Sequence, residues 1–297
     1  MNKDDIKQLI KDRTHEDGLT ETGVPGVRLF RATEAIPCRP AVYEPSVVAI
    51  VSGVKEAVLD GKRHIYDSSR YLCCPMSMPV QAGTPAATPD KPLLGVYISL
   101  DQSMMTGLTL EMKNVGDDSP IEKGHPPAQG IRLAHWDDGF SNALMRLLEL
   151  GDNKTDTAIL GRARLRELYY AILKGDAGVF ARQAFGADNA IARSIAHVSS
   201  HLEAPISIDD MASRAGMSRA AFHRKFKQVT TMAPIQFVKS MRLNNAAMKI
   251  AGGMTINEAA MNVGYVSPSQ FSREFKRMYG QSPRKWSHGH QVAVGVA

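Results

Sequence analysis

The stretch that decides the fold reads SIDDMASRAGMSRAAFHRKFK over residues 207–227. A second stretch, TINEAAMNVGYVSPSQFSREFK over residues 255–276, repeats its outline. Each begins with a hydroxyl residue followed by Ile, a pattern typical of a helix N-cap and its first buried position. Each then has a Gly at a turn, Gly216 or Gly264, and a Ser that can cap a second helix. We therefore predict two helix-turn-helix units near the C-terminus.

Both second helices carry Phe-x-Arg-x-Phe followed by Lys. The Phe residues stand four apart, so each pair shares one helix face and can be buried. Arg224 and Arg273 fall on a different face and can reach outward. A buried aromatic face behind an outward Arg suits a helix that enters the major groove of DNA.

The segment between the two units, residues 234–250, predicts a single helix. At 1.5 Å per residue it would be about 25 Å long. Two recognition helices that flank such a rod could enter successive major-groove turns, about 34 Å apart on one face of the DNA. The alternative is a plain helical bundle that resembles helix-turn-helix units by chance. Both the repeated pattern and the charge argue against this alternative.

Positive charge is concentrated in the C-terminal third. The 297-residue chain has a formal net charge of +6, but residues 190–297 hold fourteen Lys and Arg against five Asp and Glu, a net +9. The remaining residues carry a net charge of −3. This asymmetry is typical of a nucleic-acid-binding domain joined to a domain of another kind, and the length fits about two domains.

Several classes of protein find no support in the sequence. No apolar run approaches the roughly twenty residues that span a membrane, and the polar N-terminus lacks a signal-peptide core. Three cysteines cannot form a disulfide framework, so we expect a cytoplasmic protein. No Ser-His-Asp order, phosphate loop or deaminase pattern is present. A methyl-accepting repair domain fused to such a protein would need a zinc-binding set of cysteines. Cys38, Cys73 and Cys74 are one cysteine too few for that set, and their spacing is wrong. We expect no enzyme activity.

The N-terminal half predicts a small β-barrel or sandwich. Strands are expected over residues 46–51, 55–59, 62–66, 69–74 and 92–100, with Asp60-Gly61 as a hairpin turn. A small barrel can hold one ligand, and the expected lining residues are Tyr66, Tyr71, Met76 and Tyr97. Strand alternation places only about half of such a set inward. The Pro-rich residues 82–92 predict a surface loop, either a lid or inert.

Metal binding is not expected in this domain, because His64 stands alone and a metal needs three or four convergent ligands. We predict neither a metal nor another cofactor. Cys73 and Cys74 allow two interpretations. One is a small buried hydrophobe; the other is a thiol that senses oxidants or electrophiles, with Arg70 nearby to favour the thiolate.

Residues 137–185 have a helical period. Phe140, Leu144, Leu147 and Leu148 form one apolar face. The second face is longer and contains Ile159, Leu160, Ala163, Leu165, Leu168, Tyr169, Ile172 and Leu173. The two helices together have more apolar surface than a single layer of helices packed on a barrel would bury. Such a surplus of apolar surface suggests a binding partner. The helices therefore either mediate dimerisation or only brace the barrel. Residues 180–189 are expected to form a linker.

Residues 190–286 resemble the DNA-binding domain of AraC/XylS-family transcription regulators. The shared marks are residues 208–215, Gly216-Met-Ser, both Phe-x-Arg-x-Phe patterns, Pro234, Phe237, Arg242-Leu243, Ile256, Ala259-Ala260, Val263-Gly-Tyr, and Gly280-Gln-Ser-Pro-Arg-Lys-Trp. Residues 47–100 resemble the cupin-like sensor domain of one AraC-type subfamily, through residues 45–55, Asp60-Gly-Lys and Tyr71-Leu-Cys-Cys-Pro-Met-Ser-Met-Pro.

This resemblance implies an α+β protein with a cupin-like β-barrel sensor domain (residues 1–136), a helical dimerisation and linker segment (137–189) and a seven-helix, two-lobed DNA-binding domain (190–297). It implies double-stranded promoter DNA, a small-molecule effector, RNA polymerase and a second copy as partners. The alternative is a redox- or electrophile-sensing regulator that acts through Cys73 and Cys74. The sequence does not specify the effector or the operator.

Residues on the outward face of the recognition helices are expected to read bases. These are Ala220, Ala221, His223 and Arg224 in the first lobe, and Ser269, Gln270 and Arg273 in the second. Arg fits guanine and Gln fits adenine, each with two hydrogen bonds. Basic residues at the sides and ends of these helices are expected to contact phosphates, namely Lys225, Lys227, Lys276, Arg277 and Lys285.

Overall fold

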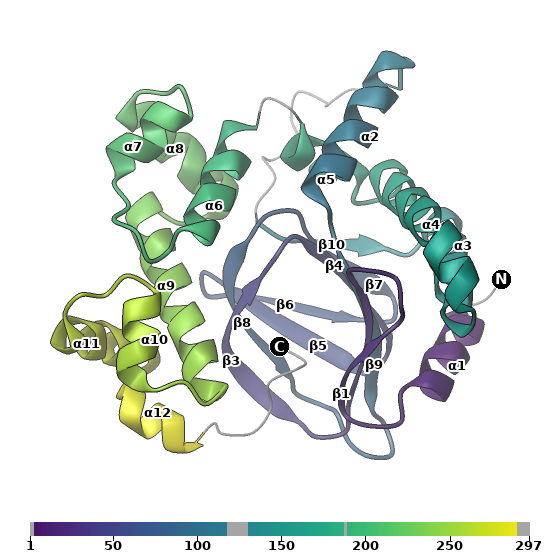
Figure 1. The fold of residues 1–297 in the computed structure, drawn as a ribbon, viewed down its shortest axis with the longest axis horizontal. Coiled ribbons are helices and arrows are strands. Elements are labelled where there is room, and N and C mark those ends of the chain that lie inside the picture. The colour runs from purple at the N-terminus through teal and green to yellow at the C-terminus, as the bar shows by residue number, and fades with distance from the viewer. Residues whose placement is uncertain (1–2, 118–129, 187–188, 290–297) are drawn as a thin grey trace.

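The computed structural model describes residues 3–117, 130–186 and 189–289. It is a mixed helix and sheet protein, as predicted, with two antiparallel sheets in the N-terminal half and helices alone in the C-terminal part (Figure 1). The large sheet has the order β1 (Gly18–Glu21), β2 (Val27–Ala32), β9 (Leu93–Ser99), β4 (Ser46–Ser52), β7 (Arg70–Cys74), β10 (Arg132–His135). The small sheet has the order β3 (Ile36–Tyr43), β8 (Met78–Thr84), β5 (Val54–Leu59), β6 (Lys62–Asp67).

The two sheets are not closed into a barrel, which corrects the predicted closed form. No strand ladder joins them among the described residues. The chain passes from β4 to β5 at Gly53, which has a φ of +82°. A Cβ there would lie 2.9 Å from the Leu93 Cα, so only glycine fits the turn. This sharp turn sends β5 into the small sheet instead of extending the ladder of the large one.

Helices cover one face of the large sheet. They are α1 (Lys3–Arg13), α2 (Gln102–Asn114), α3 (Asp138–Leu148), the 3₁₀ turn η1 (Glu149–Asp152), α4 (Lys154–Lys174) and α5 (Gly178–Phe185). Ile6 and Ile10 of α1 are buried, and α1 lies against β4 and β9. Because the small sheet faces the other side, β4 is buried along nearly its whole length. The predicted face of Phe140, Leu144, Leu147 and Leu148 is buried, as expected.

Two segments differ from the sequence prediction. The loop expected over residues 82–92 begins later, because residues 82–84 belong to β8 and are buried there. The linker expected over residues 180–189 contains most of α5, whose Phe180, Ala181, Ala184 and Phe185 are buried. Both segments carry turn-forming residues, but their apolar side chains pack into the core and hold the backbone in regular structure. Helix α2 was not singled out from the sequence at all.

Residues 189–289 form seven helices, as the family resemblance implies: α6 (Ala190–Ser200), α7 (Ile208–Arg214), α8 (Arg219–Thr230), α9 (Pro234–Ala251), α10 (Ile256–Asn262), α11 (Pro268–Tyr279) and α12 (Pro283–Gly289). Helix α9 is the predicted rod, and it separates a first lobe of α6–α8 from a second lobe of α10–α12 (Figure 1). It also lies against β3 and β8 of the small sheet.

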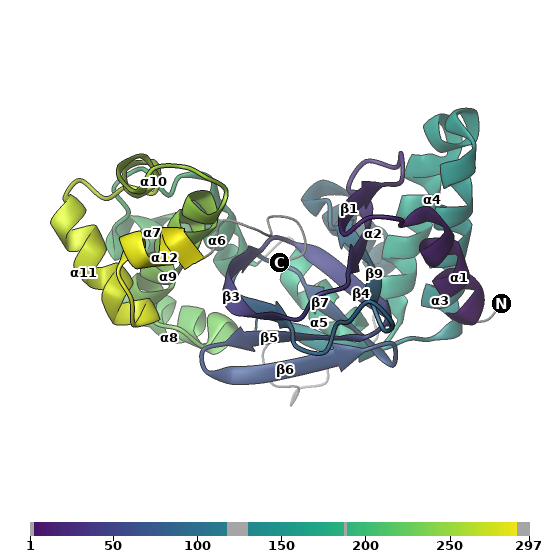
Figure 2. The same cartoon turned by 90° about the horizontal axis from the view of Figure 1, so that it is seen from below.

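The two lobes do not share one hydrophobic core. Phe222, Phe226 and Phe237 belong to the same buried cluster as the two-sheet domain. The second lobe has a separate core that includes Phe271, Phe275 and Trp286. Figure 2 shows the resulting arrangement from below, with the lobes at one end, the sheets in the middle and α3 and α4 at the other end.

Candidate DNA-binding interface and sensor domain

The first helix-turn-helix unit consists of α7 and α8. The Ser207 Oγ accepts a hydrogen bond from the Asp210 N–H at 3.0 Å, and the Ser218 Oγ accepts one from the Ala221 N–H at 3.3 Å. Gly216 forms the turn with a φ of +64°. The N-caps and the turn glycine were predicted from the sequence and are confirmed.

The second unit, α10 and α11, is built in the same way. Thr255 and Glu258 form a capping box at the start of α10, and the Ser267 Oγ accepts a hydrogen bond from the Gln270 N–H. Gly264 forms the turn with a φ of +83°. The repeated outline in the sequence is therefore a repeated structure.

Paired aromatic rings anchor each recognition helix. Phe222 and Phe226 of α8 are fully buried with ring centroids 5.4 Å apart, and Phe226 packs edge-on against Phe237 of α9. Phe271 and Phe275 of α11 are also fully buried, with the same centroid separation. The predicted apolar face of both helices is confirmed, and it fixes which face of each helix points outward.

The residues expected to read bases gather on two outward faces. In α8, Ala220, His223 and Arg224 are exposed and Ala221 is half-buried. In α11, Ser269, Gln270 and Arg273 are all exposed. The residues expected to contact phosphates are exposed too: Lys225, Lys227, Lys276, Arg277 and Lys285. The base and phosphate roles themselves remain predictions.

Glu274 is a residue of this surface that the sequence reasoning missed. Its carboxylate accepts hydrogen bonds from the Tyr265 hydroxyl at 2.7 Å and the Gln270 Nε2 at 3.3 Å, and the Lys239 Nζ lies 3.5 Å away. Burial acts to raise the pKa of Glu274, but these hydrogen bonds and Lys239 outweigh it and lower that pKa. Glu274 therefore orients the Gln270 amide through one of its N–H groups. The sequence did contain a signal for this contact, because Glu274 stands four residues after Gln270 and residues at that spacing are neighbours on a helix surface.

The inner faces of the two sheets carry several buried polar groups. The Tyr66 hydroxyl lies 3.2 Å from the Tyr43 hydroxyl, across the small sheet. The Lys55 side chain is buried, and its Nζ lies 5.9 Å from the Phe30 ring centroid in the opposite sheet. Burial lowers the pKa of Lys55 to about 8. The sequence reasoning missed Lys55. Alternation could have revealed it, because Lys55, Ala57 and Leu59 stand two apart on one strand and therefore share its inward face.

The four expected lining residues do not all come together. Tyr66 lies among the inner polar groups, and Tyr97 is half-buried with the Arg28 guanidinium 4.8 Å from its ring centroid. The Met76 carbonyl accepts a hydrogen bond from the Cys74 Sγ at 3.1 Å. Tyr71, however, is stacked on Phe140 of α3 with centroids 4.3 Å apart. Strand alternation therefore turns Tyr71 toward the helices and away from the small sheet.

Cys73 and Cys74 occupy opposite faces of β7, as alternation predicts, but both are fully buried. Burial raises the pKa of Cys73 to about 12 and that of Cys74 well above its ordinary value. Cys38 is half-buried, and burial together with Glu56, whose carboxylate lies 3.0 Å from its Sγ, raises its pKa to about 12. Thiols with such pKa values have little thiolate near neutral pH.

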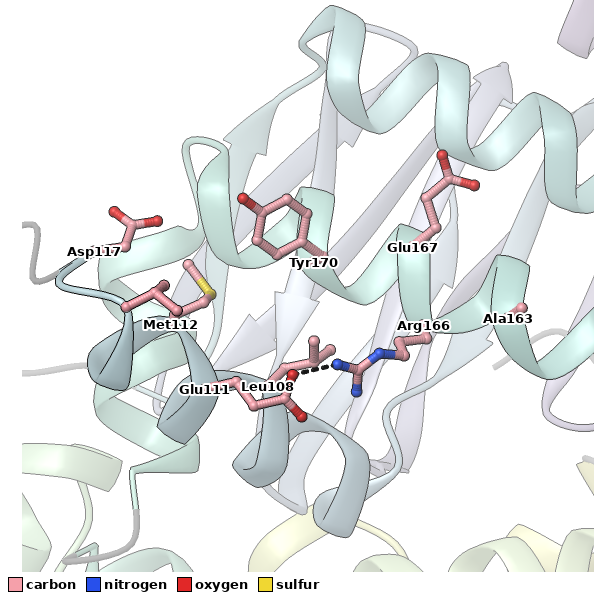
Figure 3. Close-up of a pocket in the computed structure, with 9 residues that line it drawn as sticks. Leu108, Glu111, Met112, Asp117, Ala163, Arg166, Glu167 and Tyr170 are labelled. Carbon is pink, nitrogen blue, oxygen red and sulfur yellow. Dashed lines mark hydrogen bonds and ion pairs between the residues drawn. The ribbon is translucent and has the colours of Figure 1, made fainter.

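A groove lies between α2 and α4 (Figure 3). Its volume is about 390 Å³, and Leu108, Met112 and Tyr170 supply apolar walls. Arg166 pairs with Glu111 across it, as Figure 3 shows. Val115, which also lines the groove, is 82% exposed. Most of the apolar face predicted for α4 is buried within the single chain, and only its first part remains uncovered. Leu165, Leu168, Tyr169, Ile172 and Leu173 are buried, whereas Ile159 is 71% exposed and Leu160 is 40% exposed.

In residues 3–117, 130–186 and 189–289, no group of three or more His, Cys, Asp and Glu side chains could hold a metal ion. Among the helices within those same ranges, none combines the length and apolar character of a membrane span.

Comparisons with known proteins agree with this architecture. The family model for the AraC-type transcriptional regulator N-terminus matches residues 23–180, and a helix-turn-helix domain model matches residues 211–289. Regulatory protein SoxS of Escherichia coli (strain K12) is 33% identical over 95 residues, which are 32% of this chain and 89% of SoxS.

Solved structures of ToxT from Vibrio cholerae are similar over most of the chain. ToxT of strain O395 bound to (E)-4-(8-methylnaphthalen-1-yl)but-3-enoic acid has a TM-score of 0.59 at 13% identity, over 92% of this chain and 99% of that one. Unsaturated-fatty-acid-bound ToxT of strain SCE256 has a TM-score of 0.55 at 12% identity, over 96% of this chain and 100% of that one. At such identities the likeness shows the fold alone.

The fold and its two outward helix faces define a DNA-binding protein with two helix-turn-helix units joined to a two-sheet domain. The chain belongs to the AraC/XylS family of transcription regulators, with an N-terminal sensor domain.

Proposed function

We propose that this chain is a sequence-specific transcription regulator that reads two adjacent segments of promoter DNA and responds to a small molecule in its two-sheet domain. The observation that carries the DNA-binding part is the pair of recognition helices, each with buried Phe residues on one face and an exposed Arg on the other. The net charge of +9 over residues 190–297 supports it, because phosphate contacts supply much of the affinity for DNA.

The proposed base contacts are those of the sequence prediction. Arg224 and Arg273 reach guanine, Gln270 reaches adenine, and Ala220 and Ala221 offer only methyl contacts. We further propose domains at residues 1–136, 137–189 and 190–297. RNA polymerase as a partner rests on the family alone.

We propose an effector that combines an apolar body with a negative charge. Lys55 supports this class, because a buried ammonium beside an aromatic ring suits an anionic group better than a neutral one. The acids bound by ToxT are of the same chemical kind. Such a ligand changes regulation only if it binds one conformation of the chain more tightly than another.

The thiol-sensing alternative is the weaker of the two. Cys73 and Cys74 are fully buried with raised pKa values, which opposes rapid reaction with oxidants or electrophiles. We keep it as a second candidate that a double Cys73→Ser, Cys74→Ser variant would test.

We propose that a second copy of the chain covers the groove between α2 and α4. A twofold interface brings the same patch together from both subunits, so the patch must not repel itself. The groove is suited to this because acidic Glu111 and Asp117 lie beside basic Arg166 and Lys174 around an apolar floor. Such charges can pair across the axis.

The experiment that tests DNA reading is a footprint of the full chain on the DNA upstream of its own and neighbouring genes, followed by affinity measurements on the protected fragment. Arg224→Ala and Arg273→Ala should each cost about 1–3 kcal/mol and relax one operator position. If both variants kept the affinity and the base preference of the unaltered chain, the proposed docking would be wrong.

A further inference from the structure

The sensor domain touches each recognition helix at its C-terminal end. For the second helix the contact passes through Asn244, which lies on α9 and is only 3% exposed. Its Nδ2 donates hydrogen bonds to the Ala41 carbonyl of β3 at 2.8 Å and to the Val80 carbonyl of β8 at 2.9 Å. Its Oδ1 accepts a hydrogen bond from the Tyr279 hydroxyl at 2.6 Å.

The chemistry of these partners fixes the orientation of the amide. Two carbonyl oxygens can only accept, so the NH₂ group of Asn244 must face the sheet. The carbonyl of Asn244 then faces Tyr279, the last residue of α11. Burial raises the pKa of Tyr279 well above its ordinary value, which keeps that hydroxyl protonated as the donor. One side chain thus joins two strands of the small sheet to the second recognition helix.

The first recognition helix has its own contact with the sensor domain. The Gly130 N–H donates a hydrogen bond of 2.9 Å to the Val229 carbonyl, one residue before the end of α8. Gly130 has a φ of +48°, and a Cβ there would lie 2.7 Å from the Met78 Cε of β8. Gly130 therefore packs directly against the small sheet, which is the sheet that Asn244 also contacts.

Neither contact covers the residues that face DNA. Arg224 and Arg273 remain exposed, and the hydrogen bonds engage the opposite ends of α8 and α11 from their N-caps. A contact of this kind does not block DNA. It restricts how the two helices are oriented relative to each other and to the sensor domain.

We propose that Asn244 is a positioning residue for DNA recognition, which holds α11 in the orientation set by the small sheet while the Gly130–Val229 bond holds α8. Preorganisation lowers the ordering cost of binding. A loss of the Asn244 contacts therefore weakens operator binding and broadens the spacings between the two half-sites that the chain tolerates. The proposal rests on the proposed function, because it needs both helices to read DNA.

The test uses the full chain and the footprinted DNA fragment, together with fragments that carry one base pair inserted or deleted between the two protected segments. Asn244→Ala and Tyr279→Phe should each bind the natural fragment about tenfold more weakly, within the usual range of coupling between sites. Both should also lose most of their preference for the natural spacing. The double variant should be no weaker than the weaker single variant, because both changes break one chain of bonds.

Two matched variants control for general damage. Asn245→Ala removes the neighbouring amide, whose Nδ2 donates a hydrogen bond to the Met241 carbonyl within α9. Tyr265→Phe removes a hydroxyl of the second lobe that bonds to Glu274, the partner of Gln270, so it is expected to lower affinity while the link between α11 and the small sheet stays intact. Both should keep the spacing preference, and circular dichroism should show all variants folded. If Asn244→Ala fails to fold, Tyr279→Phe alone still decides.

Each remaining outcome has a defined meaning. A folded Asn244→Ala or Tyr279→Phe chain with unaltered affinity and spacing preference would overturn the proposal, and so would tighter binding, which would make the contact a restraint. If the unaltered chain protects no DNA, or Arg224→Ala and Arg273→Ala both keep its affinity and base preference, the proposed function fails instead.

Discussion

The guanidinium Nη2 of Arg242 donates a hydrogen bond of 2.7 Å to the Ala204 carbonyl. Its Nε donates another to the Leu202 carbonyl at 3.0 Å. Arg242 thus ties the linking helix to the loop between α6 and α7. The turn glycine of the second unit meets the same loop, because a Cβ on Gly264 would lie 2.7 Å from the Leu202 carbonyl oxygen. The two lobes therefore touch at this loop.

We expect Arg242→Lys to destabilise the chain by about 1–3 kcal/mol, since lysine lacks the planar fork and leaves a carbonyl without its donor. Gly264→Ala should destabilise it as well, because the residue has both a positive φ and no space for a methyl group. Denaturant unfolding measures both. Lys249→Ala, on the same helix, is the control and should change stability little.

The salt dependence of DNA binding should separate the two kinds of contact. Lys276→Ala should weaken binding to all sequences alike and reduce the slope of log affinity against log salt by about one unit. Arg273→Ala should change the preferred base instead. Affinities at several salt concentrations on matched and mismatched fragments give both quantities. A Lys276 variant with a new base preference and the old slope would reverse this assignment.

Thiol reactivity should be low in the folded chain. The pKa values of Cys38, Cys73 and Cys74 are all raised, so the thiolate fraction near pH 7.5 is small. We expect iodoacetamide to label all three much more slowly than it labels the unfolded chain, as mass spectrometry would show. Rapid labelling of Cys73 or Cys74 in the native protein would instead favour the thiol sensor.

The groove between α2 and α4 should govern self-association. Tyr170 is 44% exposed at the groove, so Tyr170→Glu should leave the monomer folded while adding a charge at the proposed interface. Light scattering should find the unaltered chain dimeric at micromolar concentration and the variant monomeric. Ile65→Glu serves as the control, because Ile65 is also exposed but lies on β6 of the small sheet. A monomeric unaltered chain, on and off DNA, would contradict the dimer.

The pH dependence of stability should report Lys55. Its pKa falls from an ordinary 10.5 to about 8 on folding. Between these values the unfolded chain binds the proton and the folded chain does not, so this group makes stability rise with pH. Below pH 8 its destabilising effect is at its full size.

From pH 7 to pH 10 the unaltered chain should therefore gain roughly 2 kcal/mol relative to Lys55→Met, at 1.36 kcal/mol per unit of pKa. Denaturant unfolding at both pH values measures this difference. Parallel pH profiles for the two chains would show that Lys55 keeps its ordinary pKa.

The sequence by itself determined the helix-turn-helix units and the helix between them. Their signals are local: a capping hydroxyl, a turn glycine and two Phe residues four apart lie within one short segment each. The strands at residues 46–51, 55–59 and 62–66 were predicted for the same reason, because alternation and the Asp60-Gly61 turn are read from neighbours along the chain.

Only the tertiary structure decided which faces are covered and which distant groups meet. Tyr71 and Cys73 alternate with Leu72 and Cys74 on one strand, yet both faces are buried because α3 lies on one side and the small sheet on the other. Residues 82–84 and α5 pack into cores that no local pattern reveals. Asn244 reads as an ordinary polar residue of a helix. Its proposed role follows from its hydrogen bond to the carbonyl of Ala41, which stands 203 positions earlier in the sequence. That hydrogen bond exists only once the small sheet is folded against α9.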